Sequence, residues 1–202
     1  MARPANPELK PRMLEEARRL LQRDGWAAFS LRKVARQVPC APTAVYLHFD
    51  NKDALVHALI DEGMGRLFER LSTAAASKAS SPRVRIERMC RAYMAFGLEN
   101  REFYEIMFSL PPEQMERYPS EMYKRAVLNL GLFQEALAEA WGCPGSDAKD
   151  VRLAATSIWS CLHGALCLMC NQRIDFSLPQ DEVIRSSVEL ALCMVDRRPG
   201  AG

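Results

Sequence analysis

Apolar side chains recur at intervals of three and four residues along almost the whole chain, which is the repeat of one face of an α-helix. Proline, glycine or capping residues bound many of these segments, as they commonly bound helices. The segments lie at about 13–25, 30–38, 42–49, 51–76, 86–96, 103–110, 123–141, 147–172 and 181–196. No alternating run predicts a strand, so we expect an all-α fold of about nine helices.

The second segment has the features of a short, one-sided helix. It begins at Ser30, a residue type that favours helix N-caps, and it ends before Pro39, which has no N–H to continue the helix. Its apolar stripe consists of Leu31, Val34, Ala35 and Val38. The basic residues off this stripe, which can face a polyanion, are Arg32, Lys33 and Arg36.

A second short helix and the start of a third follow directly. Pro42 suits the first position of a helix, and Val45 and Phe49, four residues apart, can share a buried side. The residues left to face outward are Thr43, Ala44, Leu47 and His48. Asn51 can cap the next helix and place Lys52 in its first turn. This layout can set a helix in the DNA major groove while flanking residues contact phosphate, so it predicts a helix-turn-helix.

The same segment resembles the N-terminal domain of TetR-type transcriptional repressors over roughly residues 13–59. The matching residues are Gly25, Phe29, Ser30, Leu31, Arg32, Val34, Ala35, Val45, Tyr46, His48, Phe49, Lys52, Ala54 and Leu55. The resemblance implies phosphate contacts by Tyr46, His48 and Lys52. It implies contacts to base edges or the nearby backbone by Arg32, Pro42, Thr43 and Ala44, with Ser30 at the same interface.

Three residues depart from the pattern of the family. The turn carries Pro39 where the family usually has glycine, Cys40 where it has valine, and Ala41 where it has serine or threonine. Proline excludes a left-handed turn residue, and alanine offers no side-chain cap. The angle of the second helix and the operator sequence therefore do not carry over from the family.

Domain boundaries and charge agree with DNA binding at one end of the chain. We assign residues 1–55 to a DNA-binding domain and residues 56–202 to ligand binding and dimerisation, with the helix at about 51–76 linking them. The Ser-, Ala- and Lys-rich patch Ser77–Pro82 ends that helix. Residues 1–52 carry ten Lys/Arg and five Asp/Glu, whereas the remainder carries seventeen and twenty. A basic head on a mildly acidic body fits a nucleic-acid partner for the head.

The sequence contains few features that are typical of an enzyme. It has three histidines, no Gly-rich phosphate loop, no nucleophile elbow and no paired-carboxylate motif, so we expect neither catalysis nor a cofactor. The seven cysteines are scattered, and the first residues, MARPANPELKPR, are polar and proline-broken. We therefore expect reduced thiols and a cytoplasmic location.

The most specific motif of the body is Trp159-Ser-Cys-Leu-His163-Gly164, which resembles the tryptophan/histidine–glycine signature of one TetR subgroup. On a helix this motif and the following turns place a set of side chains on one stripe. They are Trp159, His163, Leu166, Cys167 and Cys170. The stripe can be a wall of a ligand pocket with His163 as its polar anchor. It can equally be a core helix, in which His163 bonds to a neighbour and Gly164 allows close packing.

Two further interpretations concern the ligand. Apolar residues that could surround a small, largely apolar effector are Met94, Phe96, Phe103, Tyr104, Met107, Phe108 and Trp159, and Cys167 lies beside them on the stripe. The alternative is a thiol- or metal-responsive regulator that uses His163, Cys167 and Cys170, since residues three and four apart on a helix can converge on one ion.

The last two helices predict self-association. Residues 153–172 lack Asp, Glu, Lys and Arg, and helix 181–196 has one long apolar face. A segment of this length could span a bilayer, but its polar residues favour a helix buried between neighbours or subunits. Pairing of the two helices across a twofold axis gives a four-helix bundle, as the resemblance also implies. The predicted protein is a homodimeric repressor of a pseudo-palindromic operator, released by a small molecule.

Overall fold

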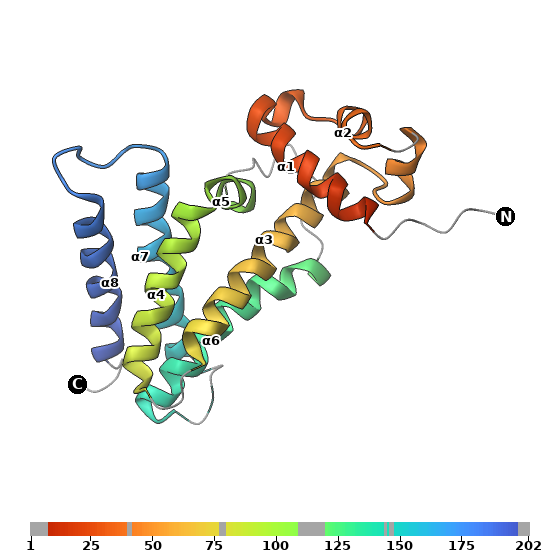
Figure 1. Ribbon diagram of the computed structural model, residues 1–202. Coiled ribbons are helices and arrows are strands. Elements are labelled where there is room, and N and C mark those ends of the chain that lie inside the picture. Colours follow the sequence, from red (N-terminus) through yellow and green to blue (C-terminus); the bar gives the residue numbers. More distant parts are fainter. Residues whose placement is uncertain are drawn as a thin grey trace. The chain divides into compact units, whose positions relative to one another are not determined.

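The computed structural model describes residues 8–39, 42–76, 80–108, 120–143, 145 and 148–197. All regular elements in these ranges are helices (Figure 1). They are α1 (Leu9–Ala28), α2 (Leu31–Gln37), the 3₁₀-helix η1 (Pro42–Leu47), α3 (Lys52–Ala75), α4 (Pro82–Glu99), α5 (Arg101–Phe108), α6 (Ser120–Trp141), α7 (Lys149–Cys170) and α8 (Gln180–Asp196). The all-α prediction is confirmed, and where about nine helices were expected the described ranges contain eight α-helices and one 3₁₀-helix.

Contacts divide the chain into two compact units. The first comprises Met1–Gly63 and Glu102–Met122, and the second comprises Met64–Arg101 and Tyr123–Gly202. α3 is one continuous helix with residues in both units. α5 belongs to the first unit except for Arg101. The predicted loop around Pro111, Pro112 and Pro119 lies outside the described residues.

In the first unit, local chemistry sets the ends of the short helices. Gly25 has φ 70° and ψ 174°, which breaks the helical path inside α1, so the predicted stop is a kink followed by one more turn. The hydroxyl of Ser30 accepts a hydrogen bond from the backbone N–H of Lys33 at 3.3 Å, which confirms the predicted cap. α2 then ends at Gln37, two residues before Pro39. Its whole predicted stripe is buried, namely Leu31, Val34, Ala35 and Val38.

α5 packs within the first unit through its aromatic and methionine side chains. A Cβ placed on Gly63 of α3 would lie 2.6 Å from the sulfur of Met107 and 3.1 Å from Phe103 Cδ1. Gly63 therefore allows α3 to approach α5 more closely than any larger residue would. On α1, Arg18 forms an ion pair with Glu102 at 2.6 Å and lies 5.0 Å from the centroid of the Phe103 ring. Phe103 itself is fully buried.

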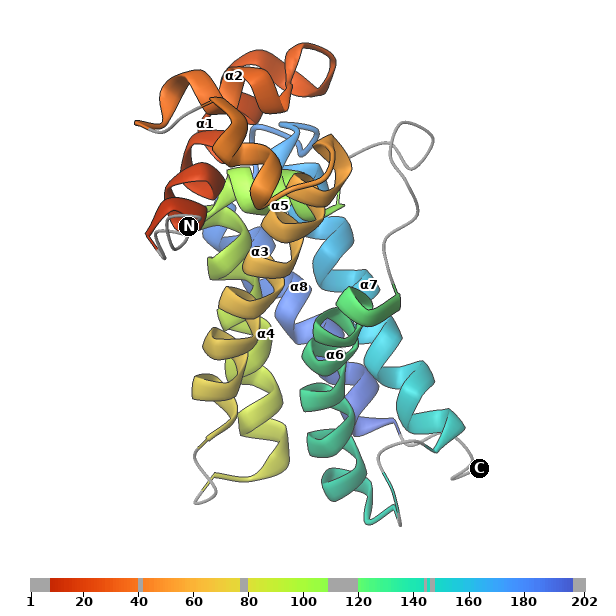
Figure 2. The ribbon, with the colours of Figure 1, turned by 90° about the vertical axis from the view of Figure 1, so that its right-hand side faces the viewer.

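In the second unit, α4, α7 and α8 pack against one another, and both views show them side by side (Figures 1 and 2). The indole N–H of Trp141 on α6 donates to the carbonyl of Val195 on α8 at 2.8 Å. The side-chain amide of Asn129, also on α6, donates to the carbonyl of Met64 on α3 at 3.1 Å. These bonds satisfy the buried N–H donors of the two side chains and hold α6 within the unit.

Candidate DNA interface and effector-binding residues

η1 presents one buried side and one exposed tip. Val45 is fully buried and Phe49 is 4% exposed, as the spacing of the two residues predicted. Tyr46 and Leu47 are 53% and 83% exposed, whereas Ala44 and His48 are half-buried. The expected second helix is the tighter 3₁₀ type, which is common for pieces this short. The turn residues Cys40 and Ala41, and the side chains of Pro42 and Thr43, lie outside the described set.

The N-terminus of α3 lies directly after this exposed tip in the chain. The side-chain oxygen of Asn51 accepts a hydrogen bond from the N–H of Ala54 at 2.7 Å, which confirms that cap. The ammonium of Lys52 lies 5.8 Å from the centroid of the Phe29 ring. Partial burial lowers the pKa of Lys52. A phosphate oxygen placed at this helix N-terminus would favour the charged lysine and offset that effect.

The basic side chains of α2 differ in how far they are neutralised. Lys33 pairs with Asp24 at 3.0 Å, and Arg23 pairs with the same carboxylate at 2.7 Å. The two cations hold the pKa of Asp24 well below its usual range. Arg32 and Arg36 are exposed and form no ion pair with any residue in the described ranges. Their charge is therefore the more available to a polyanion.

In the second unit, four side chains of α4 and α7 form a continuous series of contacts. The indole N–H of Trp159 donates to the hydroxyl of Tyr93 at 3.0 Å, and that hydroxyl lies 3.4 Å from Nδ1 of His163. Nε2 of His163 lies 3.5 Å from the sulfur of Cys167. The rings of Trp159 and His163 stack with centroids 5.3 Å apart. Burial lowers the pKa of His163, so the imidazole is neutral at neutral pH.

Both parts of the chain match known protein families. Residues 13–59 match the family described as bacterial regulatory proteins, tetR family. Residues 86–191 match the tetracyclin repressor-like C-terminal domain. This chain belongs to the TetR family. It is a transcriptional regulator with a DNA-binding helix-turn-helix, and repressor activity and ligand binding are typical of the family.

Solved structures show the same fold. A protein of unknown function from Rhodococcus sp. RHA1 is 25% identical, with a TM-score of 0.76 over 96% of this chain and 98% of that one. A tetR-family regulatory protein from Rhodococcus RHA1 is 20% identical, with a TM-score of 0.70 over 94% and 98%. A TetR/AcrR-family regulator from Thermobifida fusca YX-ER1 is 24% identical, with a TM-score of 0.66 over 96% and 99%. Among curated proteins, none matches this chain.

The effector residues predicted for this TetR-family chain fall into two groups. Phe103, Tyr104, Met107 and Phe108 belong to the first unit, where the first three are buried. Met94, Trp159, His163 and Cys167 belong to the second unit. In the first group, the ring centroids of Tyr104 and Phe108 lie 4.8 Å apart. In the second group, direct contacts join Trp159, His163 and Cys167. Sequence reasoning missed Tyr93, whose hydroxyl connects two of them, because its spacing matched an ordinary apolar stripe.

One expectation about this stripe is not met within the single chain, and another is supported. A Cβ on Gly164 would meet no atom of the described structure within 4 Å, so this glycine does not allow close packing inside the chain. The contact of His163 with Tyr93 does fit the interpretation of a histidine bonded to a neighbour. Within the described residues, no group of three His, Cys, Asp or Glu side chains could hold a metal ion, which gives the metal alternative no support.

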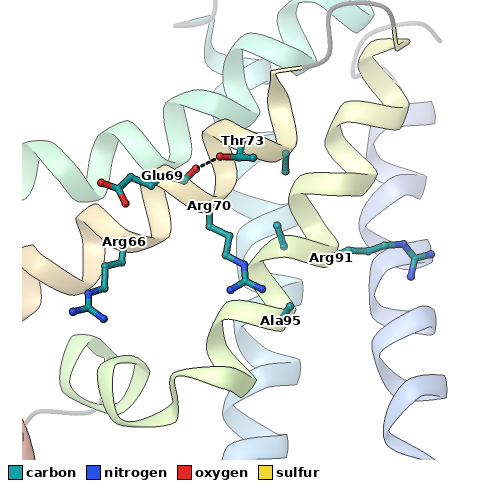
Figure 3. A pocket seen from close by; sticks show the side chains of 8 residues that line it. Arg66, Glu69, Arg70, Thr73, Arg91 and Ala95 are labelled. Atoms are coloured by element: carbon teal, nitrogen blue, oxygen red, sulfur yellow. Dashed lines mark hydrogen bonds between the residues drawn. The ribbon is translucent and has the colours of Figure 1, made fainter.

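An open groove of about 640 Å³ lies in the second unit between α3 and α4 (Figure 3). Its lining includes Arg66, Glu69, Arg70, Thr73, Arg91 and Ala95. Arg70 pairs with Glu99 and Arg91 with Glu87, so both cations are already compensated. None of the predicted effector residues lines this groove.

Proposed function

We propose that the protein is a cytoplasmic homodimer that represses transcription from a pseudo-palindromic operator and is released by a small, largely apolar molecule. The observation that carries this proposal is the exposed tip of η1 directly before the capped N-terminus of α3, in a chain of the TetR family. That family is one of regulators rather than enzymes. Operator binding, dimers and small-molecule effectors are usual in it.

The DNA contacts follow from exposure and charge. Tyr46, His48 and Lys52 would contact phosphate, which gives affinity without sequence preference. Arg32 on α2, with Pro42, Thr43 and Ala44 of η1, would lie at base edges or the adjacent backbone. Two such heads would read half-sites about 34–36 Å apart, one helical turn of DNA.

Dimerisation through α7 and α8 is supported by the apolar surface that a single chain leaves exposed. Leu153 and Leu168 of α7 are 55% and 50% exposed, and Leu190 of α8 is 57% exposed. α7 is long and apolar enough to cross a membrane by length and composition alone, and only 28% of its most apolar window is buried. In a regulator, a second copy of α7 and α8 is the expected cover for these side chains.

Effector release is supported by the contacts of α7. A ligand that meets Trp159 and His163 meets an aromatic surface with a polar neighbour, the usual composition of small-molecule sites. To release DNA, the ligand must bind more tightly to the conformation of the protein that does not bind DNA. A coupling free energy of about 1–3 kcal/mol between ligand binding and DNA binding is ordinary. The alternative of a thiol-responsive regulator is supported by one observation, the contact between His163 and Cys167.

The test of the proposal is a salt-titrated mobility shift on DNA flanking the gene of this protein. Lys52→Ala is expected to weaken binding to every sequence and to reduce the slope of log affinity against log salt by about one, because one phosphate contact is lost. Lys124→Ala, at an exposed lysine of α6 outside the proposed dimer interface, is the matched control and should leave both quantities unchanged. A folded dimer without salt-sensitive binding, or a Lys52→Ala slope equal to that of the unmodified protein, would contradict the proposal.

A further inference from the structure

Cys167 differs from the other described cysteines in its polar partner. Its sulfur lies 3.5 Å from Nε2 of His163, one helical turn earlier on α7, and the residue is partly exposed. A thiol beside a neutral imidazole has the two components of an activated nucleophile, a sulfur and a base within reach. Among the described cysteines, the contact with an imidazole is a feature of Cys167, whereas Cys90 is buried.

The hydrogen bonds of His163 allow it to act as that base. The hydroxyl oxygen of Tyr93 has two lone pairs, so it can accept from the Trp159 indole and also from a proton on Nδ1 of His163. With the proton on Nδ1, Nε2 carries a lone pair directed at the Cys167 thiol. Burial lowers the pKa of His163, which keeps the imidazole in its neutral, proton-accepting form.

The position on α7 has one unfavourable and one favourable effect on a thiolate. Cys167 lies in the last turn of the helix, where the carbonyl end of the dipole disfavours negative charge. Arg101 opposes this effect, because its guanidinium donates to the carbonyls of Met169 and Cys170 at 3.2 and 3.3 Å. These two effects oppose each other, so we assign the activation of the thiol to the neighbouring imidazole.

We propose that Cys167 is the attachment site of an electrophilic effector, an α,β-unsaturated carbonyl compound, with His163 as the base. The inference rests on the proposed function and names the chemical class of its effector. An apolar enal or enone fits because the stacked Trp159 ring offers an aromatic face to its carbon chain.

The reaction is an addition that needs no oxidant and no leaving group. Nε2 of His163 takes the thiol proton while the sulfur of Cys167 forms a bond to the β-carbon of the effector. The π electrons of the carbon–carbon double bond move to the carbonyl oxygen as an enolate. The imidazolium then returns the proton to the α-carbon. One S–H adds across one C=C, and His163 is regenerated.

The other cysteines allow the reactivity of Cys167 to be compared with that of thiols in different surroundings. Burial raises the pKa of Cys90 to about 12, and it raises the pKa of Cys161, whose thiol also faces the carbonyl of Ser187 at 3.7 Å. Both are expected to react slowly. Cys170 is the matched control, because it lies on the same helix, three residues further on, and is also partly exposed.

The experiment treats the full-length protein with a limiting amount of trans-2-hexenal and locates adducts by mass spectrometry of peptides. Cys167 is expected to react at least about 10-fold faster than Cys170, and His163→Gln is expected to slow it by at least about 10-fold, since a positioned base contributes at least that much. Circular dichroism and the melting temperature establish that His163→Gln is folded. Should that variant unfold, Tyr93→Phe serves instead, because it removes the group that orients the imidazole. Equal rates at Cys167 and Cys170, or a rate at Cys167 unchanged in the folded variant, would overturn the inference.

A mobility shift with the same samples tests the regulatory part. The Cys167 adduct is expected to bind the operator at least 5-fold more weakly, as an ordinary coupling would give. Cys167→Ser should bind DNA with normal affinity, and hexenal should not change that affinity. Cys170→Ser should lose operator affinity on treatment with hexenal, like the unmodified protein. A stoichiometric adduct with unchanged affinity overturns the inference and leaves the regulator intact. Absence of DNA binding by the untreated protein refutes the proposed function instead, and the adduct rates still test the chemistry.

Discussion

Leu168→Glu combined with Leu190→Glu is expected to convert the dimer into monomers and to lower operator affinity by about 100-fold or more. The two leucines are 50% and 57% exposed in the single chain, on the two helices that we propose to pair. In a symmetric interface each substitution occurs twice, so the double variant would bury four carboxylates without partners. A monomer then binds one half-site and loses the avidity of two linked heads, which is typically a factor of about 10²–10⁴.

Sedimentation velocity and a mobility shift together check this prediction. Leu128→Glu is the matched control, because Leu128 is 53% exposed on α6, outside the proposed interface. It should sediment and bind DNA like the unmodified protein. A double variant that still sediments as a dimer would move the interface away from α7 and α8, and a monomer with full operator affinity would contradict the role of dimerisation.

Phe103→Ala is expected to lower the free energy of unfolding by about 3–5 kcal/mol, the usual cost of removing a buried phenylalanine. Phe103 is fully buried, it contacts the space left by Gly63, and Arg18 lies over its ring. The substitution removes the ring from all of these neighbours and leaves a cavity beside α3.

Urea denaturation followed by circular dichroism measures this effect. Phe176→Ala is the control, since Phe176 is 90% exposed in the single chain and its removal should change stability by less than about 0.5 kcal/mol. A loss below about 1 kcal/mol for Phe103→Ala would show that its ring lines open space, as the effector-pocket prediction implies. The same pair of variants therefore separates a core role from a ligand-binding role.

The structural role of α5 could not be read from its sequence. An aromatic and methionine stripe at helical spacing fits a ligand pocket and a packed core equally well. The difference lies in whether another element fills the space beside the stripe, and here Gly63, 40 residues before Phe103, lets α3 do so. The role of Tyr93 could not be predicted for the same reason. The hydrogen-bond partners of its hydroxyl lie on α7, and the sequence does not show that α7 packs beside it.

Gly164 illustrates the opposite case within the single chain. In the sequence, a glycine beside a histidine in an apolar helix reads as a site of close approach. In the structure it lies on the exposed side of α7, and a methyl group there would meet nothing within the described chain. A helix wheel gives relative direction around an axis but not which direction faces the interior, and that is decided by neighbouring helices.

By itself, the sequence determined the features that depend on contacts within a few residues. The cap at Ser30, the end of α2 before Pro39, the cap at Asn51 and the pairing of Val45 with Phe49 all followed from local chemistry and helical spacing. The charge of the head and the all-α class are of the same kind. The tertiary structure decided which long-range partners meet, namely Arg18 with Glu102, Gly63 with Met107, and Tyr93 with His163. Such contacts join residues far apart in the chain, so they depend on how helices pack, which periodicity along one helix does not specify.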